Sequence, residues 1–216
     1  MPAGLGFNAA YLMIIPLVFW CIDEKKGLRL GIALLIYCWI HRALNHLLDP
    51  PQSIEIAIRL ATGGVILCAY ILAGRRIEAM LAPHSPRAGM IACAILAFAM
   101  NLYRPSLAFL MPAGLVLGLG TGYFLCWRYI VNPAPSASAL SGMPGMIKRL
   151  GRFALGSAGM ILLYTATTRI TEGLTGTGNY QLYVFLRFVL LALWISAGAP
   201  WLFRALRLCS HTEIEE

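Results

Sequence analysis

Long apolar runs, interrupted at short intervals by proline, glycine or charge, constrain this chain more than any other feature. Seven runs can be placed approximately, at 7–22, 27–47, 54–73, 88–103, 106–131, 146–170 and 180–206. A bilayer core of roughly 30 Å needs about 20 apolar residues per helix, so such runs predict membrane-spanning helices. Because 59% of the residues are hydrophobic and only 12% charged, we expect an all-α, polytopic transmembrane helical bundle of about seven spans, or six.

The segments between the runs carry helix breakers or charges, as turns at a membrane surface do. They cover 23–27, 49–52, 83–87, 103–105, 132–145 and 172–179. No stretch remains for a soluble domain, so residues 1–216 are predicted to form a single integral membrane domain. Its parts are an amino-terminal part at 1–53, central helices at 54–131 and a carboxyl-terminal helix pair at 146–208.

Lysine and arginine are distributed unequally between the two sides of the predicted bundle. If seven helices alternate, one side receives twelve of them: Lys25, Lys26, Arg29, Arg75, Arg76, Arg87, Arg128, Lys148, Arg149, Arg152, Arg204 and Arg207. The other side receives three, Arg42, Arg104 and Arg169. Positive loops stay in the cytoplasm, so we expect a multi-pass protein of the inner membrane with its amino terminus outside and its carboxyl terminus inside. The net charge of +8 then reflects topology and contact with anionic lipid, and nucleic acid is not an expected partner.

Signal-peptide, metal and cofactor readings are not favoured. Residues 1–8 carry no Lys or Arg, so the first run is interpreted as a retained span. The six cysteines show no C-x-x-C spacing and are expected to pack as small apolar residues. His41 and His46 lie five apart and project about 140° from one another on a helix, and no Cys or carboxylate completes a ligand set. No metal and no cofactor is predicted.

The outer end of the second run is polar. Residues 39–52 read Trp-Ile-His-Arg-Ala-Leu-Asn-His-Leu-Leu-Asp-Pro-Pro-Gln. With residues 20–30 and the apolar helix between, this stretch resembles the amino-terminal part of bacterial type 2 phosphatidic acid phosphatases. In that family the helix ends in a Lys, six residues, then Arg-Pro, with another Pro just ahead of the Arg. When Pro51 is matched to that preceding Pro, the Lys position falls on Asn45, the Arg on Gln52 and the final Pro on Ser53, so both cations are missing.

The resemblance implies a phosphatase-like fold that has lost its chemistry. The family's other motifs, Pro-Ser-Gly-His and Ser-Arg followed by Gly-x-His and Asp, are not found, and the nearest string, 83–89, has a different order. Residues 114–128, 148–156, 183–188 and 193–203 look like the extra helices that follow the catalytic core in one bacterial branch. Phosphoryl transfer relies on Lys and Arg clamps that neutral amides replace poorly. The resemblance therefore implies no catalytic residues, although Asn45 and Gln52 could still hydrogen-bond a headgroup.

Three glycines fall four residues apart, at Gly114, Gly118 and Gly122. Small residues at this spacing line one face of a helix and let a neighbouring helix approach closely in lipid. We interpret them as helix-packing positions, either within the chain or against a partner subunit. A nucleotide-binding loop is not favoured, because no strand precedes Gly118-Leu-Gly-Thr-Gly122.

Ionisable residues near the outer leaflet are the sharpest candidates for a site. Arg42, His46 and Asp49 share a helical face, and Glu55 and Arg59 form an i, i+4 pair. Arg187 lies seven residues inside the last run, about 10 Å deep at roughly 1.5 Å per residue. A guanidinium at that depth is costly unless paired or hydrated. One interpretation pairs Arg187 with Glu172, Glu55 or Asp49 to hold helices together. The other is a lipid or anion site whose candidates are Arg42, Asn45, His46, Gln52, Arg59 and Arg187.

Three functions of different classes follow from these observations. The favoured hypothesis is a non-catalytic membrane protein derived from a lipid-phosphatase-like fold, acting as an accessory subunit of a bacterial membrane complex or as a lipid-binding scaffold. Its expected partners are membrane lipids and other integral membrane subunits. The second hypothesis is a residual lipid phosphatase or phosphotransferase that uses His41 or His46 as nucleophile. The third is a transporter in which Arg59 and Arg187 line a path.

Overall fold

The computed structural model describes residues 5–48, 54–66, 68, 86–103, 106–126, 143–173 and 178–206. Its helices are α1 (Leu5–Cys21), α2 (Glu24–Leu48), a helical segment at 54–66, α4 (Pro86–Tyr103), α5 (Leu107–Leu125), α6 (Met143–Gly173) and α7 (Tyr180–Leu193). After α7 the helix continues through a π-helical turn, η3 (Trp194–Gly198), into α8 (Ala199–Ala205). The described part of the chain contains no strand. The predicted all-α class is confirmed.

Three described helices are long and apolar enough to cross a bilayer, namely Lys26–Leu48, Ala108–Leu125 and Tyr180–Ala205. Arg87–Tyr103 is a shorter apolar helix. Each predicted run falls on one of the described helices, although the later part of the third run and the end of the fifth lie outside the described residues. The chain is thus an all-α helical membrane protein, and the count of about seven spans stays a prediction.

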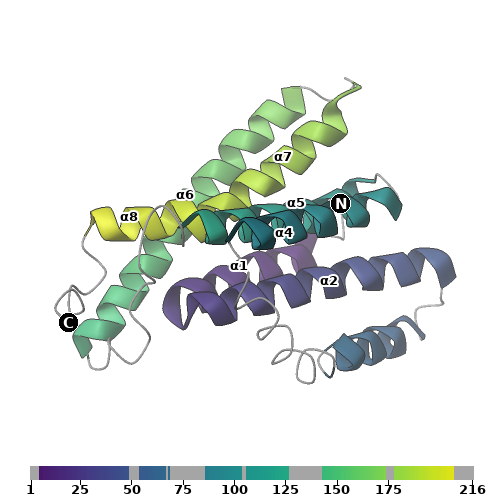
Figure 1. Cartoon of the computed structure of the whole chain (residues 1–216), viewed down its shortest axis with the longest axis horizontal. Helices are drawn as coiled ribbons and strands as arrows, with labels where there is room; N and C mark the ends of the chain where they lie inside the picture. Colours follow the sequence, from purple (N-terminus) through teal and green to yellow (C-terminus); the bar gives the residue numbers. More distant parts are fainter. Residues whose placement is uncertain are drawn as a thin grey trace.

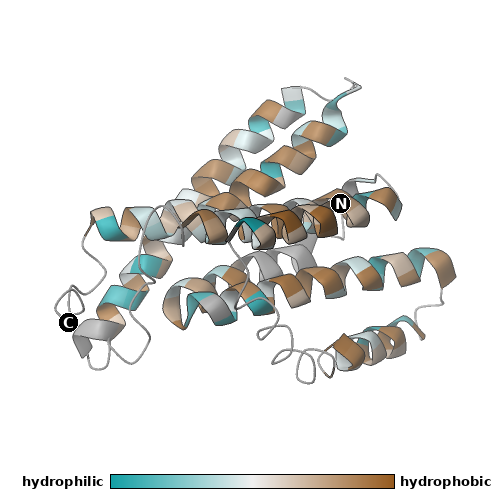
Figure 2. Ribbon diagram, in the orientation of Figure 1, coloured by the Kyte–Doolittle hydropathy of each residue, from teal (hydrophilic) through white to brown (hydrophobic). Residues whose placement is uncertain are grey.

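The helix α5 lies at the centre of the bundle. It packs against α7, α4 and α2, and Ala113, Val116 and Leu119 on it are fully buried. Figure 1 shows α1 and α2 side by side below α4 and α5, with the long α6 crossing behind them and forming a hairpin with α7. The segment 54–66 lies below α2, on the side away from α7. Apolar residues cover most of the helices (Figure 2).

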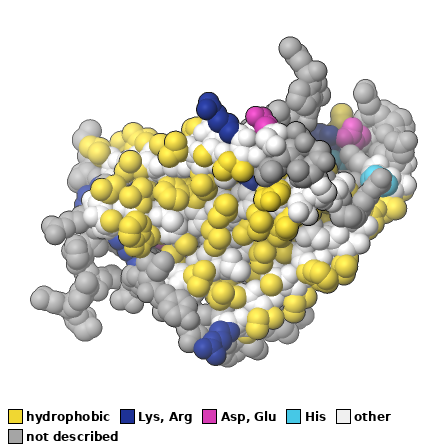
Figure 3. Space-filling view, turned by 90° about the horizontal axis from the view of Figure 1, so that it is seen from above, with side chains coloured by type: hydrophobic (Ala, Val, Ile, Leu, Met, Phe, Trp, Pro, Cys, Tyr) yellow, Lys and Arg dark blue, Asp and Glu magenta, His cyan; other side chains and the backbone are white. Residues whose placement is uncertain are grey.

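Apolar side chains also dominate the outside of the bundle. Figure 3 shows them spread over a wide face, with the Lys and Arg side chains nearer its margins. Exposed large hydrophobic residues occur on most described helices, for example Leu60, Leu102, Leu162 and Leu150. Proteins dissolved in water rarely expose an apolar surface of this extent, whereas a surface in contact with the hydrocarbon of a bilayer is expected to be apolar. The surface agrees with the predicted membrane location.

The glycine-lined face of α5 permits close contact with α7. A Cβ at Gly114 would lie 2.9 Å from the backbone oxygen of Phe185, and one at Gly118 would lie 2.6 Å from the Cβ of Ala192. A Cβ at Gly122 would overlap the hydroxyl of Ser196. These three glycines therefore face α7 and the π-helical turn within the same chain, where van der Waals contact between closely approaching backbones drives association in lipid.

The π-helical turn is explained by a proline and completed by a tryptophan. Pro200 has no N–H, so the carbonyl of Ile195, which would accept from residue 200 in the π pattern, lacks a backbone donor. The indole Nε1 of Trp20 on α1 donates to this carbonyl at 2.9 Å. The Trp20 ring packs edge-on against Phe153 and Phe203. The buried carbonyl of Ile195 in η3 is thus hydrogen-bonded by a side chain of α1, and residues of α6 and α8 hold that side chain in place.

Replacing Gly118 by alanine is expected to destabilise the bundle by about 1–3 kcal/mol, because the added methyl group overpacks the contact between α5 and α7. The matched control is Gly151→Ala on α6, where a Cβ would meet nothing within 4 Å. That control should be neutral or stabilising by up to about 1 kcal/mol through helix propensity. Thermal unfolding in a mild detergent measures both variants. A Gly118→Ala variant that is as stable as the Gly151→Ala control would contradict the packing role of Gly118.

Candidate functional site

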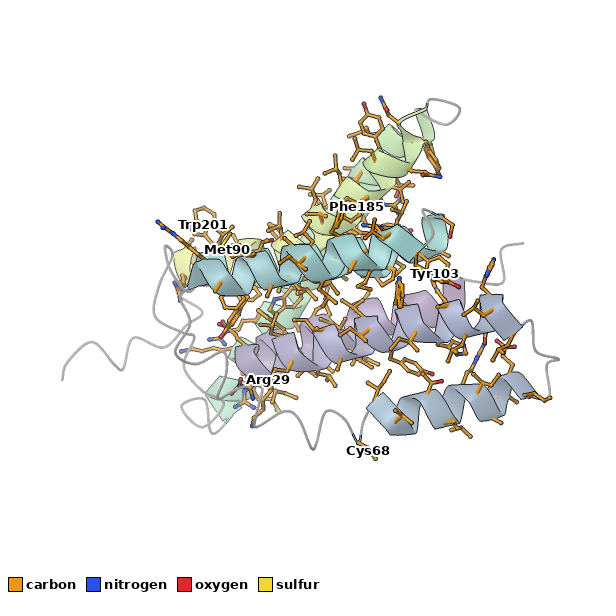
Figure 4. The ribbon with its side chains drawn as sticks, turned by 45° about the vertical axis from the view of Figure 1, so that its right-hand side comes forward. Arg29, Cys68, Met90, Tyr103, Phe185 and Trp201 are labelled. Atoms are coloured by element: carbon orange, nitrogen blue, oxygen red, sulfur yellow. The ribbon has the colours of Figure 1, made fainter. Side chains whose placement is uncertain are left out.

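The predicted outer-end residues are brought together by the end of α2 and the helical segment at 54–66. Figure 4 shows side chains of the two helices pointing toward one another. The imidazole of His41, 8% exposed, stacks on the Tyr37 ring, with centroids 5.9 Å apart and an interplanar angle of 11°. The hydroxyl of Tyr37 donates to the backbone oxygen of Arg59 at 3.4 Å. These contacts fix the rotation of the segment 54–66 against α2.

Four side chains form what we call the outer-end cluster: His41, Asn45, Glu55 and Arg59. The Asn45 amide Nδ2 donates to Glu55 Oε1 at 3.0 Å and lies 3.3 Å from His41 Nε2. Arg59 donates to Glu55 Oε1 at 2.5 Å and, through Nε, to His41 Nε2 at 3.1 Å. Asn45 therefore bridges α2 to the next helical segment.

The charges of the outer-end cluster balance. Glu55 and Arg59 form an i, i+4 ion pair, as expected from their spacing. Asn45 is neutral, and the histidine accepts from Arg59, so its Nε2 carries no proton and the remaining ring proton of the neutral form sits on Nδ1. The Nδ1 of His41 and the Oδ1 of Asn45 are buried without a hydrogen-bond partner. The cluster is a compact polar contact of one cation, one anion and two neutral groups.

The other predicted residues at this end lie around the cluster. Arg42 donates to the backbone oxygen of Ala108 at the start of α5. His46 is exposed on the last turn of α2. Gln52 and Asp49 lie outside the described residues. Arg42 and Arg59 thus each connect α2 to a neighbouring helical element.

Arg187 is not part of the outer-end cluster. Its guanidinium carbon lies 4.1 Å from the ring centroid of Tyr164 on α6 and 5.6 Å from that of Phe188. In the described part of the chain its contacts are these two rings, and neither Glu172 nor Glu55 is among them. The α6–α7 hairpin and the segment 54–66 lie on opposite sides of α2 and α5 (Figure 1). The structure therefore places Arg187 apart from the outer-end residues with which the sequence grouped it.

A cluster at the other end of the bundle was missed by sequence reasoning. Glu24, at the start of α2, experiences the positive charges of Arg204 on α8 and Arg152 on α6. Burial raises the pKa of Glu24 above its ordinary value, and the two arginines act in the opposite direction. Arg152 is 4% exposed. The sequence placed Arg152 only on the more positively charged side of the bundle, and no spacing in the sequence indicates that its charge acts on Glu24.

No group of three or more His, Cys, Asp or Glu side chains gathers at metal-binding distance within the described residues. Five cysteines of the described chain are free thiols: Cys21, Cys38, Cys68, Cys93 and Cys126.

The carboxyl-terminal half of the chain matches a known family. Residues 110–211 match the family model described as PAP2 superfamily phosphatase, transmembrane extension. The match covers α5 to α8, including the three glycines, Tyr164 and Arg187, whereas the outer-end cluster precedes it. No curated protein and no solved structure matches the chain. The predicted resemblance to this superfamily is confirmed.

A double-mutant cycle tests the contact between Asn45 and Glu55. We expect the melting-temperature losses of Asn45→Ala and Glu55→Ala to be non-additive, because each single change already removes the shared hydrogen bond. The control cycle combines Asn45→Ala with Asn101→Ala, an amide on α4 with no described contact to Asn45, and should be additive. Thermal unfolding in detergent gives both results. Additive losses for Asn45 and Glu55 would show that the two side chains do not interact.

Proposed function

We propose that this chain, whose residues 110–211 match the transmembrane extension of PAP2 superfamily phosphatases, does not cleave phosphate esters. It instead serves a bacterial inner membrane as an accessory, lipid-binding subunit of a larger assembly. The observation that carries this proposal is the internal charge balance of the outer-end cluster. Where the superfamily signature has a lysine, Asn45 bonds to Glu55, and the neighbouring cation, Arg59, is engaged by the same carboxylate.

The chemistry of phosphoryl transfer supports the proposal. Charge spreads over the equatorial oxygens in the transition state, and fixed cations aimed at these oxygens provide most of the stabilisation. An amide supplies a dipole in place of a full charge, and here that dipole already has a protein acceptor. Arg42 is directed to the carbonyl of Ala108, toward α5 and away from the segment 54–66. The described outer end therefore favours helix packing over a phosphate clamp.

A residual phosphatase that uses a histidine nucleophile is the second candidate, favoured by the burial of His41 beside a guanidinium. A nucleophilic imidazole needs a free lone pair aimed at phosphorus. In His41 the lone pair of Nε2 accepts from Arg59, so Nδ1 carries the proton. Attack by either nitrogen would first require the cluster to open. His46 is exposed on the last turn of α2.

The proposal predicts no phosphate release by the purified chain. In mild detergent, with phosphatidic acid and a polyprenyl phosphate as substrates, phosphate release should equal that of His41→Ala and His46→Ala variants and of a heat-denatured control. Release above these controls that is lost in either histidine variant would overturn the non-catalytic assignment and support the second candidate. The variants must show the wild-type elution volume, so that loss of folding is not mistaken for loss of chemistry.

The accessory role predicts stable association with other membrane proteins. Solubilised from its native membrane in mild detergent, the chain should migrate as part of a complex of fixed stoichiometry, and the partner proteins should be recovered in equal amounts from independent preparations. The control is the same purification from membranes that lack the tagged chain, which identifies proteins retained without it. A strictly monomeric chain without reproducible partners would contradict the subunit assignment.

A further inference from the structure

The α6–α7 hairpin carries a cation whose described contacts are only aromatic. Arg187 stacks on Tyr164 at 4.1 Å, and its Nε is buried without a hydrogen-bond partner. A guanidinium has five N–H donors in a planar fork that matches a carboxylate or a phosphate. Stacking on a ring holds the plane of this fork in place but supplies no acceptor. The described neighbourhood of Arg187 therefore lacks the anion that such a side chain ordinarily takes in an apolar span.

The packing of α7 determines where Arg187 points. Phe185 and Val189 face the glycines of α5, because a Cβ at Gly114 or Gly118 would meet their backbones. Arg187 is two residues from each of them, and at about 100° per residue it lies roughly on the opposite side of α7. Tyr164 contacts it there from α6. The side chain thus stands at the outer face of the α6–α7 pair, away from the centre of the bundle.

The depth of Arg187 places it near a headgroup region. From Tyr164 onward α6 changes character, reading Tyr-Thr-Ala-Thr-Thr-Arg-Ile-Thr-Glu-Gly to its end at Gly173. Hydrophilic residues interrupt the apolar surface along this end of the hairpin (Figure 2). A tyrosine at the start of a polar section marks a membrane interface. In addition, helical side chains lean toward the amino terminus, which for Arg187 is the outer end of α7.

We propose that Arg187, held in place by Tyr164, binds the phosphate group of a phospholipid in the leaflet at the 173–180 end of the α6–α7 hairpin. In the predicted orientation this is the outer leaflet. The guanidinium donates to phosphate oxygens, and the lipid chains cover the exposed apolar side chains of the hairpin, including Leu162, Leu182 and Leu186. The site uses no residue of the outer-end cluster, so it stands whether or not the chain has phosphatase activity.

Native mass spectrometry of the delipidated chain in a neutral detergent tests the site. Phosphatidylglycerol is titrated against diacylglycerol of the same acyl chains, which lacks the phosphate. Wild-type protein should bind phosphatidylglycerol at least about tenfold more tightly than diacylglycerol, and Arg187→Met should lose that preference, as expected for removal of a charge-assisted hydrogen bond. Arg169→Met, which removes an exposed cation from the same end of the hairpin, should keep it. Equal behaviour of the two variants would overturn the proposal.

Two further measurements distinguish a lipid phosphate from a soluble phosphate and from a carboxylate of a partner protein. Glycerol phosphate at millimolar concentration should not displace the lipid; displacement would assign the site to a soluble phosphate. If Arg187→Met instead releases a protein partner and leaves lipid binding unchanged, Arg187 pairs with a carboxylate of that partner and the lipid assignment fails. Should Arg187→Met not fold, Tyr164→Leu keeps the cation and removes the ring that orients it. That variant should weaken the phosphate preference several-fold, and an unchanged preference would contradict the site.

Discussion

The close contact between α5 and α7 is the interaction on which the rest of the bundle depends. Helices in lipid gain little from the hydrophobic effect when they associate, so close van der Waals contact and interhelical hydrogen bonds must provide the attraction. Gly114, Gly118 and Gly122 make that contact available by removing the side chains that would keep the backbones apart. The Ser196 hydroxyl lies between two carbonyl oxygens, 3.2 Å from that of Gly118 on α5 and 2.8 Å from that of Ala192 in its own helix, and its single proton is shared between them. The register and rotation of α7 follow from this contact.

Tryptophan and glycine repeat the same arrangement between the last helix and α6. The Trp194 ring lies where a Cβ at Gly159 would be, and its Nε1 donates to the carbonyl of Gly156 at 3.1 Å. The Trp20 ring occupies the corresponding space at Gly156. Each indole thus fills a gap left by a glycine and also satisfies a backbone carbonyl, so the π-helical turn is stabilised without a cost in unpaired polar groups.

The sequence predicted the helices and part of the site for identifiable reasons. Hydropathy indicates the membrane-spanning helices directly. The four-residue spacing of the glycines and the pairing of Glu55 with Arg59 can also be predicted, because each depends on the geometry of a single helix. Contacts between different helices produce no regular spacing in the sequence. The hydrogen bond from Asn45 to Glu55 joins residues ten apart on two helical segments, and Arg187 stacks on the Tyr164 ring of α6. An aromatic partner could not be distinguished from the many aromatics of an apolar sequence.

The neutral amide of Asn45 decides what the outer end of α2 attracts. A lysine at this position would stand beside Arg59 with Glu55 as the carboxylate between them, giving two positive charges and one negative charge. Because the cluster is partly desolvated, a ligand would have to supply the missing negative charge, and a phosphate group carries such a charge together with hydrogen-bond acceptors. With an amide in place of the lysine, Glu55 and Arg59 neutralise each other and Asn45 adds a hydrogen bond to the same carboxylate. The polar side chains at this end then connect two helices, whereas the described contacts of Arg187 are the rings of Tyr164 and Phe188, which carry no negative charge.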